Sequence, residues 1–413
     1  MAQIRPFRAY RPCQGMEKRI AALPYDVYNR EEACEVVKKN PDSFLAVDRA
    51  ETQFGEEVDT YADCVYEKAD QMLREKILEG KFVQDPTPCF YLYELTMDGH
   101  SQTGVVGCAS IDDYRNNVIK KHENTRADKE EDRIRHVDTC SMQTGPIFLA
   151  YRAKEDLKEK IGELKKQARV YDFVSEDGIG HRVWVIDNDS DVAMIEEAFG
   201  KIPAIYIADG HHRCASAVKV GLKRREQYPD YTGEEEFNYF LSVIFPDEEL
   251  RILDYNRVVK DLNGMDAATF LTRIEEYFAV EKKGQSPYRP TEKGTFGMYL
   301  ENEWYSLSAK DEIKSEDAVE GLDVSLLQND LLDPILGIMD PKTDKRIDFV
   351  GGIRGLGELE RRVHTDMKVA FSMYPTSIAE LFAVADAGRL MPPKSTWFEP
   401  KLRSGLFLHE IER

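Results

Sequence analysis

The sequence predicts a mixed α/β (α+β) fold, because segments with helical spacing of apolar residues alternate with short apolar strands along the chain. The clearest hairpin joins two apolar runs, 89–97 and 101–111, through the turn dipeptide Asp98-Gly99. A second hairpin is expected over 170–186. Antiparallel hairpins of this kind argue against a simple doubly wound parallel sheet.

The elements before residue 200 follow from periodicity and capping signals. A helical pattern runs over 31–81, is interrupted at Pro41 and stops at Gly80. After the first hairpin a charged helix is expected over 125–140, with Thr125 as its N-cap. The elements expected next are a buried strand at 145–152, a helix at 156–168, the second hairpin and a helix at 191–200.

A short strand at 204–208 runs directly into a helix, which is expected to end at Gly221. Later elements are strands at 237–246 and 250–259, a helix at 266–283, strands near 295–309 and helix–strand alternation to about 388. The expected organisation is a core at 1–262 with N-terminal helical and hairpin elaborations, a second α/β unit at 263–389, and a C-terminal segment at 390–413 that packs back toward the functional site.

Composition excludes several classes of function. The net charge of -20, without a long basic run, disfavours nucleic-acid binding. No apolar run approaches the length of a membrane-spanning helix, and the N-terminus lacks the apolar region of a secretory signal, so we expect a cytoplasmic protein with no membrane partner. The seven cysteines are odd in number and none form a CxxC pair, which predicts reduced thiols.

The segment "ADGHHR" places Asp209, Gly210, His211, His212 and Arg213 where a strand meets a helix. The first N–H groups of a helix lack internal partners and favour anions, and a guanidinium suits phosphate. This predicts a phosphate-binding turn. Two alternatives remain open: Asp209 only caps the helix and the histidines lie on the surface, or a zinc ion binds, although adjacent helical residues project about 100° apart. Asp209 beside a phosphate needs Mg²⁺ or a substrate ammonium to offset its charge.

A second cluster, "KKHENT", precedes the charged helix. His122 and Glu123 follow a strand-like segment, and loops at such positions often carry chemistry, so Glu123 is a candidate general base. The alternative is a solvated, charged helix start. Weaker candidates for contacting a substrate are Asn124, Thr125 and Arg133 in this region, and Tyr25 and Asp26 after Pro24, which can equally form a simple turn.

A third cluster lies in "PPKSTWFEPKLRSG". Lys394, Ser395 and Thr396 offer a cation and hydroxyls that could close over a bound phosphate. Lys401, Arg403 and Ser404 follow within a few residues. The alternative is a basic C-terminal segment without a role in the site.

These clusters, in this order, resemble the motifs of the free serine kinases of the ParB/sulfiredoxin-like superfamily, which carry a "PHE" element, then "VDGHHR", then "SPKTT". The matching segments here are "KKHENT", "IADGHHR" and "PPKST". Over almost its whole length, the chain also resembles the bacterial family called domain of unknown function 1015, with "PYDV" near the start and "MPPKSTxFxPKxxSG" near the end.

The resemblance implies a ParB/sulfiredoxin-like core and a kinase that converts free L-serine into O-phosphoserine, with ATP, ADP or pyrophosphate as donor and Mg²⁺ bound through the phosphates. It implies that Glu123 accepts the hydroxyl proton, with His122 and His212 beside it. The donor-binding residues implied are Asp209, Gly210, His211, His212, Arg213, Lys394, Ser395 and Thr396, with Asp209 as a candidate Mg²⁺ contact.

The chain departs from two relatives in that superfamily. Sulfiredoxins need a cysteine where this sequence has His211, while Cys214 follows Arg213, and DNA binding of the ParB type conflicts with the net charge. Two other functions remain open: a non-catalytic nucleotide or phosphate sensor, and a hydrolase of phosphoanhydrides. The oligomeric state is also open, a homodimer being one option.

Overall fold

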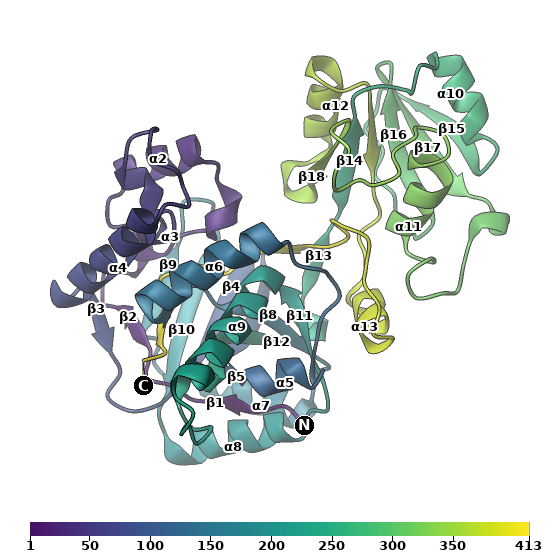
Figure 1. The fold of residues 1–413 in the computed structure, drawn as a ribbon. Helices are drawn as coiled ribbons and strands as arrows, with labels where there is room; N and C mark the ends of the chain where they lie inside the picture. Colours follow the sequence, from purple (N-terminus) through teal and green to yellow (C-terminus); the bar gives the residue numbers. More distant parts are fainter. Residues whose placement is uncertain (413) are drawn as a thin grey trace. The chain divides into compact units, whose positions relative to one another are not determined.

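A nine-stranded mixed sheet organises the first of two units in the computed structural model, which describes residues 1–412 (Figure 1). This unit comprises residues 1–250 and the chain from Pro400 onward, and the second unit comprises residues 251–399. The expected mixed α/β class is confirmed, with its antiparallel hairpins and a further α/β unit toward the C-terminus. The chain thus leaves the first unit at Arg251 and returns to it for its last residues.

The strands of the large sheet follow the order β6 (Ile119–Lys120), β11 (Ile205–Asp209), β8 (Ile147–Tyr151), β12 (Tyr239–Pro246), β5 (His100–Ser110), β4 (Phe90–Met97), β10 (Gly180–Ile186) and β9 (Tyr171–Val174), with β1 (Ile4–Arg5) pairing with β5. Pairing is antiparallel except for β6 with β11 and β8 with β12. The β4–β5 turn has positive φ at Asp98 and Gly99, as a tight hairpin requires.

Two helices, α6 (Ala127–Cys140) and α9 (His211–Gln227), lie side by side on one face of this sheet (Figure 1). Three N-terminal helices pack near them: α2 (Arg30–Lys39), α3 (Leu45–Asp48) and α4 (Asp63–Leu78). Helix α2 begins with a capping box of Asn29 and Glu32. The other elements of the unit are β2 (Tyr10–Pro12), α1 (Glu17–Ile20), η1 (Tyr25–Val27), η2 (Ala50–Gln53), β3 (Phe82–Gln84), α5 (Ile111–Arg115), β7 (Met142–Gln143), α7 (Glu155–Leu164), α8 (Asp189–Gly200), η3 (Glu236–Asn238), η4 (Asp247–Glu249) and β21 (His409–Glu410).

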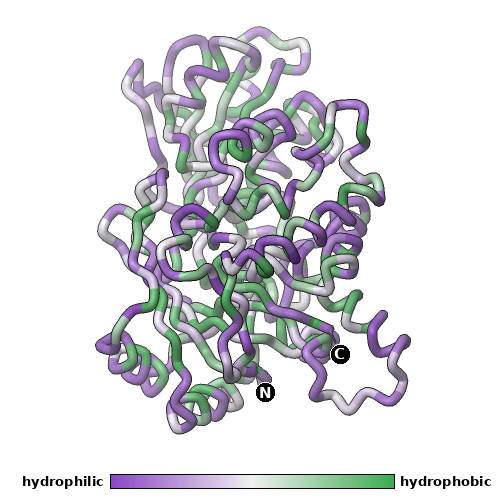
Figure 2. Tube along the Cα trace, turned by 90° about the vertical axis from the view of Figure 1, so that its left-hand side faces the viewer, coloured by the Kyte–Doolittle hydropathy of each residue, from purple (hydrophilic) through white to green (hydrophobic). Residues whose placement is uncertain are grey.

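The first unit has two main apolar clusters. One joins the sheet to the helices around it through fully buried residues such as Phe90, Leu149 and Ile207. The other holds the N-terminal helices together and includes Leu408 from the returning C-terminal segment. Figure 2 shows hydrophobic stretches of the chain trace mainly in the interior and hydrophilic ones mainly along outer loops. None of the helices in residues 1–412 is long and apolar enough to cross a membrane.

The second unit is built on a six-stranded antiparallel sheet in the order β15 (Phe278–Gly284), β17 (Glu303–Ala309), β16 (Thr295–Leu300), β19 (Val369–Ser372), β14 (Tyr255–Val259) and β18 (Ile347–Gly351). A short pair, β13 (Arg251–Leu253) and β20 (Trp397–Glu399), lies at its two chain ends. The remaining elements are α10 (Ala267–Ile274), η5 (Asp311–Ile313), α11 (Asp323–Leu327), η6 (Gln328–Leu332), η7 (Gly352–Arg354), α12 (Leu356–Thr365) and α13 (Ile378–Asp386).

Two sequence-based expectations about helix ends are wrong. The helix expected over 266–283 is only α10, because residues 278–284 form strand β15 paired with β17. Thr125 does not cap α6: the N-cap is Arg126, and the Thr125 hydroxyl instead donates to Glu130 Oε2 at 2.7 Å.

The helix at the strand-to-helix turn does not end at Gly221, which corrects a third expectation. α9 continues to Gln227, so Gly221 lies inside it. A Cβ at Gly221 would lie 2.4 Å from the Phe237 carbonyl oxygen and 2.9 Å from Ile111 Cδ1. Close packing against the neighbouring backbone, rather than a helix end, therefore explains this glycine.

We expect Gly221→Ala to destabilise the protein by about 1–3 kcal/mol, the usual cost of overpacking, despite the higher helix propensity of alanine. The control is Gly162→Ala in α7, where a Cβ would meet no atom within 4 Å and a gain of up to about 1 kcal/mol is expected. Urea unfolding of both variants measures the difference. Equal stability changes would contradict this account of Gly221.

A buried carboxylate in the second unit predicts pH-dependent stability. Gly294 N–H donates to both oxygens of Asp323, but burial raises the pKa of Asp323 to about 7. Because the pKa of Asp323 is raised in the folded state, its contribution to stability is fully present below the ordinary pKa of an aspartate and is lost as the pH rises through 7. Asp323→Asn should therefore raise the calorimetric unfolding temperature at pH 8, corresponding to at most about 4 kcal/mol. The gain should shrink at pH 5, and an equal gain at both pH values would contradict the prediction.

Candidate functional site

The parallel pairing of β6 and β11 brings the two main sequence clusters together. Ile119 lies opposite Ile205, and Lys120 lies opposite Tyr206. Because parallel strands end at the same edge of a sheet, the loop 121–126 after β6 and the turn 209–213 after β11 emerge next to each other. The candidate base and the candidate phosphate turn, almost ninety residues apart in sequence, thus share one edge of the first unit.

The turn at the start of α9 needs a glycine. Gly210 is the N-cap residue, with φ 92° and no side-chain cap. A Cβ there would also lie 3.1–3.3 Å from the guanidinium of Arg213, which folds back against it. The N-terminus of this long helix therefore lies beside a cation, an arrangement that favours anions.

Arg213 is held on its other side as well. Its Nη1 donates to the Pro146 carbonyl at 2.7 Å, and a Cβ on Gly145 would lie 3.4 Å from the same nitrogen. This bond occupies one of the five N–H donors of a guanidinium. The planar group is therefore fixed in orientation at the helix N-terminus while its charge stays available to a ligand.

Asp209 has a structural explanation that the sequence does not contain. Its Oδ1 accepts the Gly210 N–H at 2.8 Å, and its Oδ2 pairs with Lys401 Nζ at 3.0 Å. Burial opposes the charged carboxylate, but Lys401 and Arg213 outweigh burial and hold its pKa well below the usual range. Lys401 thus belongs to this site, although sequence reasoning grouped it only with the C-terminal segment.

The paired histidines diverge, as adjacent helical residues must. His211 is buried, and its Nε2 accepts the backbone N–H of His122 at 3.5 Å, while His212 Nε2 accepts the backbone N–H of Arg126 at 2.9 Å. Both acceptors fasten α9 to the loop 121–126. A neutral ring that accepts at Nε2 carries its proton on Nδ1, so each histidine keeps one N–H donor.

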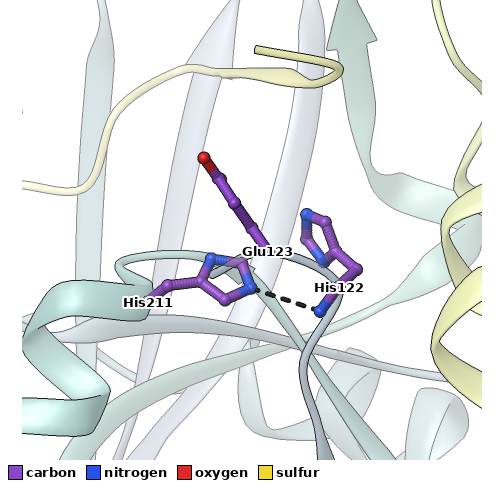
Figure 3. A group of neighbouring side chains, drawn as sticks. All are labelled: His122, Glu123 and His211. Atoms are coloured by element: carbon purple, nitrogen blue, oxygen red, sulfur yellow. Dashed lines mark hydrogen bonds between the residues drawn. The ribbon is translucent and has the colours of Figure 1, made fainter. Parts of the chain in front are cut away.

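His122, Glu123 and His211 form a compact group (Figure 3). One potential ligand atom from each residue lies within 4.8 Å of the others, and the two imidazole rings meet edge to face at 4.5 Å between centroids. Burial lowers the pKa of His122 to about 4, and burial together with His122 lowers the pKa of His211. Both rings are neutral at pH 7, so this group offers two imidazoles and a carboxylate, which can accept protons or hold a metal ion.

A cavity of about 290 Å³ lies beside α6 and the N-terminal helices, and its walls include Tyr25, Asp26 and Arg133, three of the weaker sequence candidates. The Arg133 guanidinium stacks 4.0 Å above the Tyr25 ring, and burial raises the pKa of Tyr25 to about 12. A second, smaller cavity shares Tyr25 and Arg133 with the first and is also lined by Arg213. The smaller cavity therefore reaches the turn through Arg213, and the larger one adjoins it through Tyr25 and Arg133.

The remaining predicted residues have the following surroundings. Asn124 is exposed, and Thr125 is bonded to Glu130, which in turn pairs with Lys219. Lys394, Ser395 and Thr396 lie in the second unit, where the Lys394 carbonyl accepts from Arg257 and the Ser395 carbonyl accepts from Thr376.

Comparison with known proteins identifies the family. The sequence model of the family described as "Protein of unknown function (DUF1015)" matches residues 4–325. No protein with curated annotation matches the chain.

Several solved structures share a weak likeness. A free serine kinase in complex with AMP is 15% identical, with 71% of this chain and 86% of that chain covered and a TM-score of 0.36. A conserved hypothetical protein from Pyrococcus furiosus is 16% identical, with 73% and 93% covered and a TM-score of 0.35. SbnI with a C-terminal truncation, from Staphylococcus aureus, is 10% identical, with 71% and 82% covered and a TM-score of 0.39. Scores this low establish no shared function.

Proposed function

We propose that this chain, which belongs to the DUF1015 family, is a phosphotransferase that moves a phosphoryl group from ATP, ADP or pyrophosphate to the hydroxyl of L-serine, giving O-phosphoserine. One observation carries the proposal: a carboxylate, Glu123, lies next to a glycine-containing helix N-terminus that also holds Arg213. A base beside an anion-binding turn is what transfer to a hydroxyl requires. The motif order described above supports serine as the acceptor.

The donor half of the reaction rests on charge placement. The N-terminus of α9 and the fixed guanidinium of Arg213 favour the phosphate oxygens and the charge that develops on them during transfer. Lys401 keeps Asp209 from repelling the phosphates, because it pairs with that carboxylate. The N-terminus of α9, Arg213 and Lys401 together form a positively charged site for a donor that carries several negative charges.

Magnesium is the ion that such donors ordinarily carry, and it would neutralise phosphate charge. Asp209 does not fit the role of a direct ligand without losing a partner, because its two oxygens are engaged by Gly210 and Lys401. Magnesium would therefore be held through the donor phosphates. No protein side chain is assigned to it.

The acceptor half uses Glu123 as the base. The carboxylate takes the proton of the serine hydroxyl as its oxygen forms the new bond to phosphorus, and the remaining nucleotide or phosphate leaves. The cavity of about 290 Å³ has room for roughly ten waters, which is ample for an amino acid. Arg133 suits a carboxylate and Asp48 an ammonium, and both line this cavity.

The test incubates the full chain with Mg²⁺, L-serine and each donor in turn, and follows O-phosphoserine by mass spectrometry. L-Threonine and D-serine in place of L-serine measure acceptor selectivity. Phosphoserine from at least one donor supports the proposal. Donor binding without any phosphorylated amino acid would indicate a sensor, and release of phosphate without phosphoserine would indicate a hydrolase.

A further inference from the structure

His122, Glu123 and His211 have the composition of a transition-metal site. They come from the loop after β6 and from the first turn of α9, which the β6–β11 pairing holds together, and Figure 3 shows the three side chains gathered at one place. Metal bonds of about 2.0–2.2 Å place neighbouring ligand atoms roughly 3–3.5 Å apart. The spacing of at most 4.8 Å therefore needs only a small contraction.

The burial of His122 is the second, independent observation. The His122 side chain is 2% exposed. Among residues 1–412, neither of its ring nitrogens makes a hydrogen bond of normal geometry. The Ile207 carbonyl lies near the ring and favours its protonated form, but burial outweighs this effect and lowers the pKa. Buried polar atoms of native proteins almost always have a partner, and exceptions point to an ion or water. A metal ion beside Glu123 and His211 would provide that partner.

His211 must give up one contact to bind the ion. Its Nε2 accepts the His122 backbone N–H over a long distance of 3.5 Å, and release of this contact leaves one ring nitrogen with a lone pair for the ion and the other with the proton. Glu123 supplies the single negative charge of the set and is partly exposed, which leaves a path for the ion to enter.

We propose that His122, Glu123 and His211 bind one divalent first-row transition ion, such as Zn²⁺, Co²⁺ or Mn²⁺. Two imidazoles and one carboxylate favour these ions over Mg²⁺, which prefers oxygen ligands. Only one Glu123 oxygen is needed as a ligand, so the other can still accept a proton. Metal binding does not depend on the proposed kinase activity, whereas any part the ion plays in phosphoryl transfer rests on it.

The test uses tag-free, full-length protein stripped with EDTA and titrated with Co²⁺, whose visible absorption reports imidazole ligation. We expect one Co²⁺ per chain, displaced by Zn²⁺ and unaffected by millimolar Mg²⁺. His122→Ala and His211→Ala should each weaken binding by at least about tenfold. Glu123→Gln, at a partly exposed position, gives a further ligand variant if a buried histidine variant misfolds.

His364→Ala is the matched control, because His364 is an exposed histidine of the second unit and lies outside the group. Unchanged Co²⁺ affinity in this variant is expected. Absorption without imidazole character, or equal affinity in wild type and all three ligand variants, would overturn the metal site.

The outcomes also separate the metal site from the kinase proposal. Co²⁺ bound at these residues in a protein that makes no phosphoserine would leave the metal site and remove the kinase. Phosphoserine formed with Mg²⁺ by a protein that binds no Co²⁺ would do the reverse.

Discussion

Replacing Glu123 by glutamine is expected to lower kcat for phosphoserine formation by about 10²- to 10⁴-fold, the usual contribution of a general base. The amide keeps the size of the side chain but cannot accept the hydroxyl proton. Because the proposed donor site is the turn 209–213, the KM for the donor should change little. Steady-state kinetics with saturating serine measures both quantities.

The control for this variant is Glu131→Gln, which makes the same chemical change at an exposed position of α6. Its activity should match the wild type. Full activity in Glu123→Gln would remove Glu123 as the base even if phosphoserine is formed. A matching loss of thermal stability would instead assign the effect to folding.

Replacing Arg213 by alanine is expected to cost about 10²- to 10³-fold in kcat/KM for the donor, which is typical of removing one fixed electrostatic donor from a transition state. Arg213→Lys should recover only part of this loss, because an ammonium lacks the planar fork that the Pro146 carbonyl and Gly210 hold in place. Donor affinity by calorimetry and kcat by phosphoserine assay separate binding from chemistry.

Lys223→Ala is the matched control for Arg213. It removes a cation from the far end of α9, where Lys223 pairs with Asp138. Unchanged kinetics are expected for this variant. Equal losses in Lys223→Ala and Arg213→Ala would mean that net charge, not the fixed guanidinium, governs donor binding.

Local features of the site were predictable because they depend on neighbouring residues. The β4–β5 hairpin follows from Asp98-Gly99, which tolerate positive φ, and the strand-to-helix change at Asp209 and Gly210 follows from apolar run length and periodicity. The same applies to the loop that carries His122 and Glu123. Helix capping was less predictable, because the Thr125 hydroxyl donates a hydrogen bond to the Glu130 carboxylate and does not cap the helix backbone.

Gly221 shows where a local signal misleads. A glycine near the end of a helical pattern usually marks a C-terminus, but here the neighbouring Phe237 carbonyl occupies the space of a side chain and the helix continues. Residues 278–284 mislead in a similar way, because pairing with β17 overrides their helical pattern. In both cases the deciding contact is made by another segment of the chain.

The sequence by itself determined the mixed α/β class, the hairpins, and the identities of the two segments that carry Glu123 and Arg213. Only the tertiary structure decided that these loops meet, that Lys401 neutralises Asp209, and that His122 is buried against His211. The physical reason is the distance along the chain over which each kind of interaction acts. Turn and helix preferences act over a few residues, whereas strand register and ion pairing join residues that the sequence leaves far apart.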